Sequence, residues 1–414
     1  MIKQSLYLFL FLLTGQYIWS QTVIKGKVVS GETGKPLSSV SVYLNNTTKG
    51  TVTDDKGSFI INRIPSGKFR LVASSIGYET YVKLMSPLDL SEEIVISLKP
   101  KPEQLKDISV IPFDPDGWDK WGKLFMRVFI GSNPNSYDCV IENFGVLRFR
   151  LSDNNELMVF ASEPIRIRNN ALGYEIKYKL EEFEFDFDNK IVSYSGYALF
   201  TDLSLSHPNR ALRWIAKRTD TYDQSLLHFM RAFFVNNLGA EGFEIRSLAK
   251  MYNPEKEKAL KWLSLHKDSV NKIPTDTVYA LGSAGVKITI HTADSTGYYK
   301  SILLQPDSVI SRRLVSPDSI GFAADSSTAG FYSPDSLEVS YKLKNIPGEY
   351  KRLLKSNREE TFPVSQFVFI NKKPVYVISS GYYYGLYNLK ITGFWAWWET
   401  MSTMLPYDYE PVEK

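Results

Sequence analysis

Four histidines are the side chains of this sequence that could bind a catalytic metal. They are His207, His228, His266 and His291. A zinc peptidase needs three protein ligands and one open coordination position, which requires a His-x-x-Glu pair and a further histidine. No histidine here has glutamate at the third following position. The nearest approach is Asp294 after His291, in a strand-like stretch where these two side chains point to opposite faces. The sequence therefore predicts no metal site and no cofactor.

Alternating carboxylates could supply acid and base catalysis. In "EEFEFDFD" the side chains of Glu182, Glu184, Asp186 and Asp188 share one face of a predicted strand. Two carboxyl groups about 5 to 10 Å apart are the machinery of glycoside cleavage. The same pattern arises wherever one face of a strand is solvated, and this is the interpretation that we favour. A hydrolase that uses these carboxylates is the alternative function.

Cys139 is the single cysteine of the chain. One thiol cannot form an internal disulfide, and a catalytic thiol needs a neighbouring base that the pattern around "YDCVIEN" does not supply. Free cysteines usually behave as small buried apolar side chains. We therefore expect Cys139 to be buried, and the sequence predicts no catalytic residue.

Two groups of residues are candidates for binding a ligand. Arg210, Arg213 and Lys217 fall on one face of a helix and could bind an anionic group, although a solvated basic face gives the same pattern. The aromatic stretches "YYYGLY" and "FWAWWETMSTML" could stack on sugar rings. The side chains that represent this second candidate are Tyr382, Tyr384 and Trp395. The helical spacing of the last stretch also fits core packing, which we favour.

The elements that must position these residues begin after a targeting segment. Lys3 precedes a short apolar run from Leu6 to Leu13, and a small residue, Ser20, stands before the expected cleavage point. The run is too short to span a bilayer, so we interpret residues 1–20 as a secretory signal peptide. The formal net charge of +4 gives no reason to expect nucleic acid as a partner.

Residues 21–99 predict a small β-sandwich. Short alternating strands recur between turn signals, and about seven strands fit into this length. In "SVSVYL" the side chains of Val40, Val42 and Leu44 point one way while serines and a tyrosine point the other. The turn "DDKG" contains Asp54 and Asp55, which we interpret as turn residues rather than as a calcium site.

The motifs of this region resemble the carboxypeptidase-regulatory-like family, whose fold is a transthyretin-like sandwich. The resemblance rests on "GKPLSSVSVYL", "GTVTDDKGSF" and "IPSGKFRL", and it covers residues 22–99. It implies an accessory domain without catalytic activity, of the kind that begins exported envelope proteins of Gram-negative bacteria. The zinc peptidase and the outer-membrane receptor barrel that can accompany this module are not expected here. The first lacks its ligands and the second lacks chain length.

The remaining chain predicts a linker, residues 100–114, and an α+β domain, residues 115–414. Apolar residues at helical spacing predict a helix that ends at Gly131, and hairpins with antiparallel strands are expected over 137–205. One broken helix or two helices are expected over 207–239, with a new cap at 219–221 and His228 at the surface or boundary. The serine-rich stretch 295–336 is expected to be rich in loops.

This second region also resembles a bacterial envelope family that follows the same sandwich module. The likeness lies in "WDKWGKLFMRVFIG", "HFMRAFF" and "GFWAWWETMSTMLPYDYEP", within residues 115–410. Because that family has no established activity, the resemblance implies architecture and location only.

Taken together, the residues and the resemblances predict an exported, non-enzymatic protein of the periplasm or outer membrane. Its role would be binding or assembly, with a glycan or an envelope protein as partner. Peripheral association with the outer membrane is compatible with this, and no transmembrane helix is expected in the mature chain. A hydrolase is the first alternative, and a small membrane barrel formed by residues 137–393 is the second.

Overall fold

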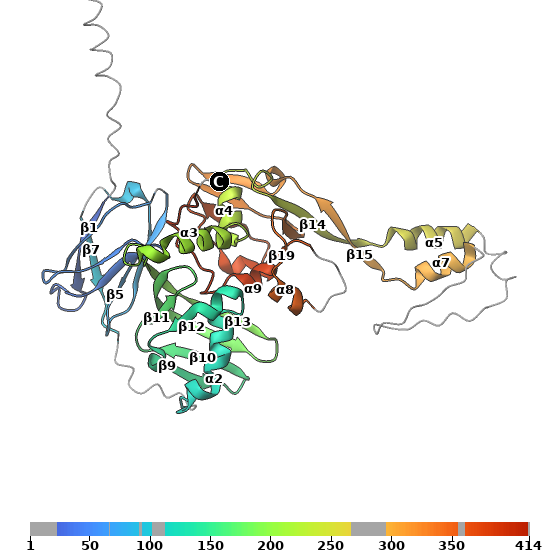
Figure 1. Cartoon of the computed structure of the whole chain (residues 1–414). Helices are drawn as coiled ribbons and strands as arrows, with labels where there is room; N and C mark the ends of the chain where they lie inside the picture. Colours follow the sequence, from blue (N-terminus) through green and yellow to red (C-terminus); the bar gives the residue numbers. More distant parts are fainter. Residues whose placement is uncertain are drawn as a thin grey trace, which may run out of the picture.

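The described residues of the computed structural model form three hydrophobic cores, and Figure 1 shows the arrangement of the helices and strands around them. The structure describes residues 23–65, 67–90, 93–101, 112–265, 295–354 and 361–412. An N-terminal sandwich encloses the first core, and a larger α+β part, built mainly from antiparallel sheets, encloses the other two. The predicted fold class is therefore confirmed.

The sandwich consists of two sheets with the orders β4-β1-β7 and β3-β2-β5-β6, in which only β1 and β7 run parallel among its described pairs. Its seven strands are β1 (Ile24–Ser30), β2 (Ser41–Leu44), β3 (Gly50–Val52), β4 (Ser58–Ile61), β5 (Phe69–Ser74), β6 (Tyr81–Met85) and β7 (Ile94–Leu98). The carboxylate of Asp54 accepts the N–H groups of Lys56 and Ser58, which is the turn role that the sequence predicts.

The second core lies between one helical segment and a six-stranded sheet. The sheet order is β8-β11-β12-β10-β9, with β13 on the other side of β12 along its length. The elements are α2 (Gly117–Phe125), a π-helical turn η2 (Met126–Ile130), β8 (Cys139–Ile141), β9 (Leu147–Leu151), β10 (Glu156–Ala161), β11 (Ile165–Asn169), β12 (Tyr174–Asp186) and β13 (Ile191–Asp202).

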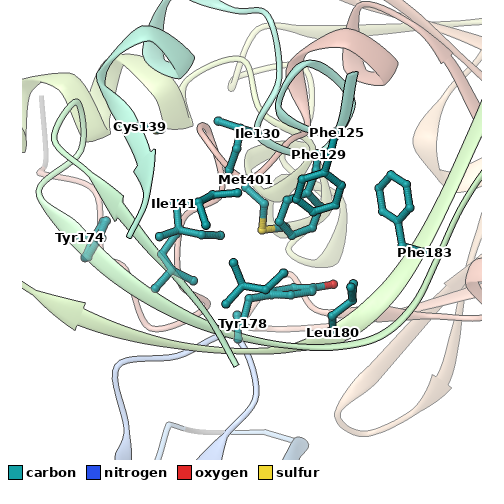
Figure 2. Packing of buried hydrophobic residues seen from close by; sticks show 14 of the residues in the cluster. Phe125, Phe129, Ile130, Cys139, Ile141, Tyr174, Tyr178, Leu180, Phe183 and Met401 are labelled. Atoms are coloured by element: carbon teal, nitrogen blue, oxygen red, sulfur yellow. The ribbon is translucent and has the colours of Figure 1, made fainter. Parts of the chain in front are cut away.

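Aromatic side chains fill this second core, as the apolar spacing of the helix predicts. Phe125 and Phe129 stack with ring centroids 4.8 Å apart and lie over Phe183 of β12 (Figure 2). The helical segment ends at Gly131, whose φ of +113° is open to glycine but strained for other residues. Cys139 is buried at the edge of this core, and burial raises the pKa of its thiol to about 12. It is therefore the small buried side chain that was expected.

Two helices follow, α3 (Pro208–Tyr222) and α4 (Leu226–Phe234). The expected new cap at 219–221 is wrong, because α3 continues through these residues. The second helix begins instead at Ser225, whose hydroxyl accepts the N–H of His228 at 3.1 Å. The helix also ends earlier than Gly239, with Val235 as its C-cap.

The third core is covered by two further sheets and by α4. The sheet orders are β15-β14-β18-β19-β22 and β16-β17-β20-β21. The elements are β14 (Phe243–Tyr252), α5 (Pro254–Leu265), α7 (Ser295–Leu303), β15 (Ser308–Leu314), β16 (Gly321–Asp325), β17 (Thr328–Phe331), β18 (Ser336–Tyr341), α8 (Gly348–Leu353), β19 (Val364–Phe369), β20 (Val375–Ile378), β21 (Tyr383–Tyr384), β22 (Leu389–Gly393) and α9 (Phe394–Trp398). The expectation of a loop-rich stretch at 295–336 is wrong, since α7, a short 3-10 helix and the strands β15, β16 and β17 occupy most of it.

A segment after α9, residues 399–410, contacts all three parts of the molecule. Met401 is buried in the second core, and its N–H donates to the carbonyl of Phe129. The guanidinium group of Arg231 on α4 donates to the carbonyl oxygens of Tyr407 and Tyr409 at 2.9 Å each. We call residues 399–410 the closing segment.

The sandwich is attached to the rest of the molecule through its β2–β3 turn. The N–H of Asn46 donates to the carbonyl of Ala198 on β13 at 2.8 Å, and the carbonyl of Thr47 accepts from Phe200 at 2.9 Å. The closing segment completes the contact, because the N–H of Tyr407 donates to the carbonyl of Asn46. The turn therefore adds to the free side of β13 like a short strand.

Replacement of Asp408 tests this attachment. Its carboxylate, with a side chain only 9% exposed, accepts the N–H and hydroxyl of Thr48 and lies 3.3 Å from the Lys49 ammonium. Asp408→Ala should lower the free energy of unfolding by about 2 kcal/mol, because the partly buried donors of Thr48 and Lys49 lose their partner. Denaturant unfolding measures this, with exposed Glu410→Ala as the matched control. Equal effects of the two substitutions would contradict the attachment.

Glu399 at the start of the closing segment should make stability depend on pH. One carboxylate oxygen accepts the N–H of Leu226 at 2.7 Å, and burial raises the pKa of this group from 4.5 to about 7 despite that bond. Between these values the folded protein holds more protons than the unfolded chain, so stability falls as the pH rises from about 4.5 to 7. Glu399→Gln should remove up to about 3 kcal/mol of this decline. Unfolding curves at several pH values measure it, with exposed Glu163→Gln as the unchanged control.

Candidate functional site

A cleft of about 260 Å³ lies between the sandwich and the second core. Hydroxyl groups and lysines dominate its walls, and none of its lining residues is acidic. The lining residues are Ser39, Ser41, Tyr43, Ser74, Ser75, Ile76, Gly77, Tyr78, Lys101, Ala161, Ser162, Pro164, Lys177, Lys179 and Leu199. We call this hollow the serine–lysine cleft.

The sandwich wall of the cleft follows from the alternation of β2. Val40, Val42 and Leu44 are completely buried between the two sheets of the sandwich. Successive side chains of a strand point to opposite faces, so Ser41 and Tyr43 lie on the outer face, toward the second core. The sequence pattern predicted which side chains of β2 point inward and which point outward. The outward side chains form one wall of the cleft.

The opposite wall follows from the alternation of β12. Ile176, Tyr178 and Leu180 are buried in the second core. Lys177 and Lys179 lie on the other face of the same strand and line the cleft. Lys177 is paired on both sides, with Arg166 of β11 and Leu199 of β13, whereas the registered partner of Lys179 is Tyr197 of β13.

Lys177 on this wall faces a like charge that lies beside the cleft, outside its lining residues. Arg166 of β11 stands directly opposite Lys177 in the register of the sheet, on the same face. Like charges in this arrangement destabilise a sheet by about 0.2–1 kcal/mol. Within the described parts of the chain, neither side chain forms an ion pair, and the same holds for Lys179 and Lys101. An anionic group in the cleft, next to Lys177, would offset this repulsion.

Tyr43 contributes a neutral hydroxyl at the cleft. Its side chain is 4% exposed, and burial raises its pKa well above the ordinary value, helped by the negative charge of Glu181 and by Tyr197. The phenol therefore remains protonated throughout the physiological range and acts as a hydrogen-bond donor or acceptor. Glu181 itself accepts a hydrogen bond from the Thr80 hydroxyl at 3.0 Å.

The basic residues singled out by the sequence lie elsewhere. Arg213 and Lys217 of α3 line a separate hollow of about 460 Å³ together with Asp138 and Asp220. Lys217 lies 3.5 Å from the Asp220 carboxylate, and Arg210 is exposed on the same helix. Because two carboxylates share this hollow, it favours an anion less than the serine–lysine cleft does.

Two of the three candidate aromatic residues lie side by side, with the rings of Tyr382 and Tyr384 stacked at 6.4 Å, whereas Trp395 is buried elsewhere. Tyr382 lies under the guanidinium group of Arg70 at 5.3 Å, and Tyr384 stacks on Tyr376 at 5.2 Å. Trp395 is 3% exposed in the third core, and its indole N–H donates to the carbonyl of Gln224 at 2.9 Å. A sugar ring could reach Trp395 only if that core opened, so core packing accounts for this residue.

Asp186, at the end of β12, serves a turn. Asp186 accepts hydrogen bonds from the side chain and N–H of Asn189 and from the N–H of Asp188, and these bonds lower the pKa of its carboxyl group. A general acid needs a raised pKa, so this shift has the wrong direction for that role. Glu184 is exposed on the same face.

His228 is buried, and its expected place at the surface or boundary is therefore wrong. It is 5% exposed, its Nδ1 lies 2.8 Å from the carbonyl of Asp223, and its Nε2 lies 3.0 Å from the Glu241 carboxylate. Its ring stacks on Tyr222. Across the described residues, no three His, Cys, Asp or Glu side chains are grouped to hold a metal ion. His266 and His291 lie outside those residues.

Comparison with known proteins identifies the N-terminal part. Residues 24–110 match the family described as CarboxypepD_reg-like domain. A stretch of 94 residues, 23% of this chain, is 34% identical to TonB-dependent receptor P39 of Formosa agariphila and covers 9% of that protein. The sandwich is therefore the carboxypeptidase-regulatory-like domain that the motifs predicted, which differs from a carboxypeptidase catalytic domain.

This match ends at residue 110, so the resemblance of residues 115–410 to an envelope family stays a prediction. The boundaries of the predicted linker and of the α+β domain stay predictions as well. None of the helices in the described part of the chain has the length and apolar character needed to cross a membrane.

The sequence contains a signal for the cleft that its motifs did not single out. The pattern "SSVSVYL" around β2 alternates hydroxyl and apolar residues. The pattern "IKYKL" in β12 alternates lysines with apolar or aromatic residues. Each pattern alone indicates a strand with one solvated face. Only the docking of the sandwich on β12 and β13 places these two faces opposite each other, and strand patterns carry no information on that docking.

Reversal of one charge tests the repulsion in the cleft. Lys177→Glu should raise the free energy of unfolding of the unliganded protein by about 0.5–1 kcal/mol, because Arg166 then faces a carboxylate. Thermal or denaturant unfolding measures the change. Lys390→Glu is the matched control, since Lys390 is an exposed strand lysine opposite Val368, and it should change stability little. A loss of stability in Lys177→Glu would contradict the repulsion.

Proposed function

We propose that this protein is a non-enzymatic binding protein of the bacterial cell envelope. Its ligand would be an anionic, hydroxyl-rich molecule, such as a short acidic oligosaccharide, held in the serine–lysine cleft. The observation that carries the proposal is the set of lysines, Lys101, Lys177 and Lys179, which face serine hydroxyls with no acidic residue in the cleft lining.

Location in the envelope is supported by two features. The segment 1–20 has the pattern of a secretory signal peptide. The regulatory-like domain also occurs in a protein named as a TonB-dependent receptor, although the matched stretch is 9% of that protein. The activity and partners of that receptor are therefore no guide to this chain beyond the shared module.

The chemistry of the cleft suits an acidic saccharide. Lysine ammonium groups attract carboxylate, sulfate or phosphate groups, and serine hydroxyls can donate to or accept from sugar hydroxyls. Ile76 and Tyr78 add apolar surface for the faces of sugar rings. A volume of about 260 Å³ suits a short segment of a chain rather than a folded protein.

Calorimetric titration of the mature protein with trigalacturonate and with neutral maltotriose tests the proposal. Binding of the acidic sugar should weaken as salt rises, because the ion pairs are screened. The double variant Lys177→Gln/Lys179→Gln should weaken it at least about tenfold. Lys390→Gln should bind as the unmodified protein does.

Equal affinity for both sugars, or acidic binding that survives the double substitution, would refute the cleft as an anion site. Unfolding curves of each variant ensure that a loss of binding is not a loss of fold.

A further inference from the structure

An arm projects from the body of the molecule at β14 and β15 (Figure 1). The first part of β14, from Phe243 to Leu248, pairs with β18 inside the five-stranded sheet. From Ala249 to Tyr252 its registered partner is β15 alone, and the ribbon ends at the helices α5 and α7. Among the described residues, the arm is therefore attached to the body at one end, through the first part of β14.

The outer side of β15 is an open sheet edge. β15 is the last strand in its sheet, and its pairing with β14 runs without a register shift from Ser308↔Tyr252 to Leu314↔Arg246. No described backbone group outside β14 bonds to residues 308–314. Such an edge presents a row of free N–H and C=O groups that can pair with another strand.

Proteins usually blunt an edge of this kind with proline, with charged side chains, with a bulge or by covering it. The sequence "SVISRRL" contains no proline, and the register contains no bulge. Ile310 and Leu314 are 64% and 68% exposed on one face of the ribbon. An accessible, regular edge with exposed apolar side chains has the features of a binding surface.

The charges on the edge indicate what kind of strand it would accept. Residues 308–314 carry two arginines and no carboxylate. Arg312 is directed toward the body by Glu338 of β18, at 3.4 Å. Arg313 is exposed and forms no ion pair within the described chain, and Lys250 stands opposite Ile310 on β14. A partner with carboxylates beside apolar residues would match this pattern.

We propose that the outer edge of β15 binds an extended segment of an acidic partner protein by strand addition. Backbone hydrogen bonds along residues 308–314 would supply affinity. Apolar side chains of the partner would cover Ile310 and Leu314, and a carboxylate would pair with Arg313. This surface belongs to the five-stranded sheet and contains no residue of the serine–lysine cleft.

A membrane surface fits the arm less well. Exposed apolar side chains occur on both faces of the ribbon, with Ile310 on one and Met251 on the other. One flat bilayer surface could cover only one of these faces. A second copy of this chain also fits less well, because pairing of β15 with itself would gather four arginines at one junction.

Fluorescence anisotropy with synthetic peptides tests strand addition on the full mature protein. The probe is a labelled peptide as long as β15, in which glutamate and valine alternate. It should bind, whereas a peptide of alternating lysine and valine, or the acidic peptide N-methylated at every backbone amide, should not. Hydrogen exchange at residues 308–314 should slow when the acidic peptide is bound.

Arg313→Glu should weaken binding of the acidic peptide at least about fivefold. Arg127 is an exposed arginine of η2, far along the chain from β15. Arg127→Glu is therefore the matched control and should leave binding of the acidic peptide unchanged. Equal binding of the lysine peptide, or exchange protection outside β15, would overturn the proposal.

Two further results would reassign the edge. If the protein dimerises as its concentration rises, and Arg313→Glu changes that dimerisation, the edge of β15 is occupied by a second copy of this chain. Binding to phosphatidylglycerol vesicles that the same substitution abolishes would identify a membrane. The thermal unfolding curve of Arg313→Glu should match that of the unmodified protein, which shows that a change in binding is not a loss of fold.

Discussion

The closing segment, residues 399–410, is the constraint on which the arrangement of the three cores depends. It places Met401 in the second core, receives the guanidinium group of Arg231 from the third, and binds the β2–β3 turn of the sandwich through Tyr407 and Asp408. These contacts are mostly hydrogen bonds to backbone groups, which fix position more strictly than apolar packing does. The orientation of the sandwich, and hence the width of the serine–lysine cleft, follows from them.

The cleft illustrates how two ordinary strands can together make a charged site. The outer faces of β2 and β12 are each typical of a solvated strand, yet the docking of the sandwich places the hydroxyls of one against the lysines of the other. Arg166 and Lys177 remain opposite each other at an energetic cost to the unliganded sheet. Local costs of this kind are typical of functional sites, which supports the proposal that the cleft binds a ligand.

Sequence reasoning succeeded where one element determines its own pattern. The alternation in β2 and β12 and the helical stripe through Phe125 and Phe129 predicted these elements and their buried faces. It failed where contacts between elements decide. His228 is buried because Phe243 and Tyr341 come from distant strands to cover it, and stretch 295–336 forms strands because β14 and β20 pair with them. The cleft depends on such long-range docking and was missed for this reason.

The bond between Thr48 and Asp408 also has a kinetic consequence, since 360 residues separate its two ends along the chain. Contacts this distant form late and slowly, because a long loop must close before they gain anything. The sandwich can finish its own core early, whereas its anchoring surface waits for a stretch synthesised hundreds of residues later. A chain that crosses a membrane unfolded would thus complete its assembly only on the far side, after nearly all of it has passed through.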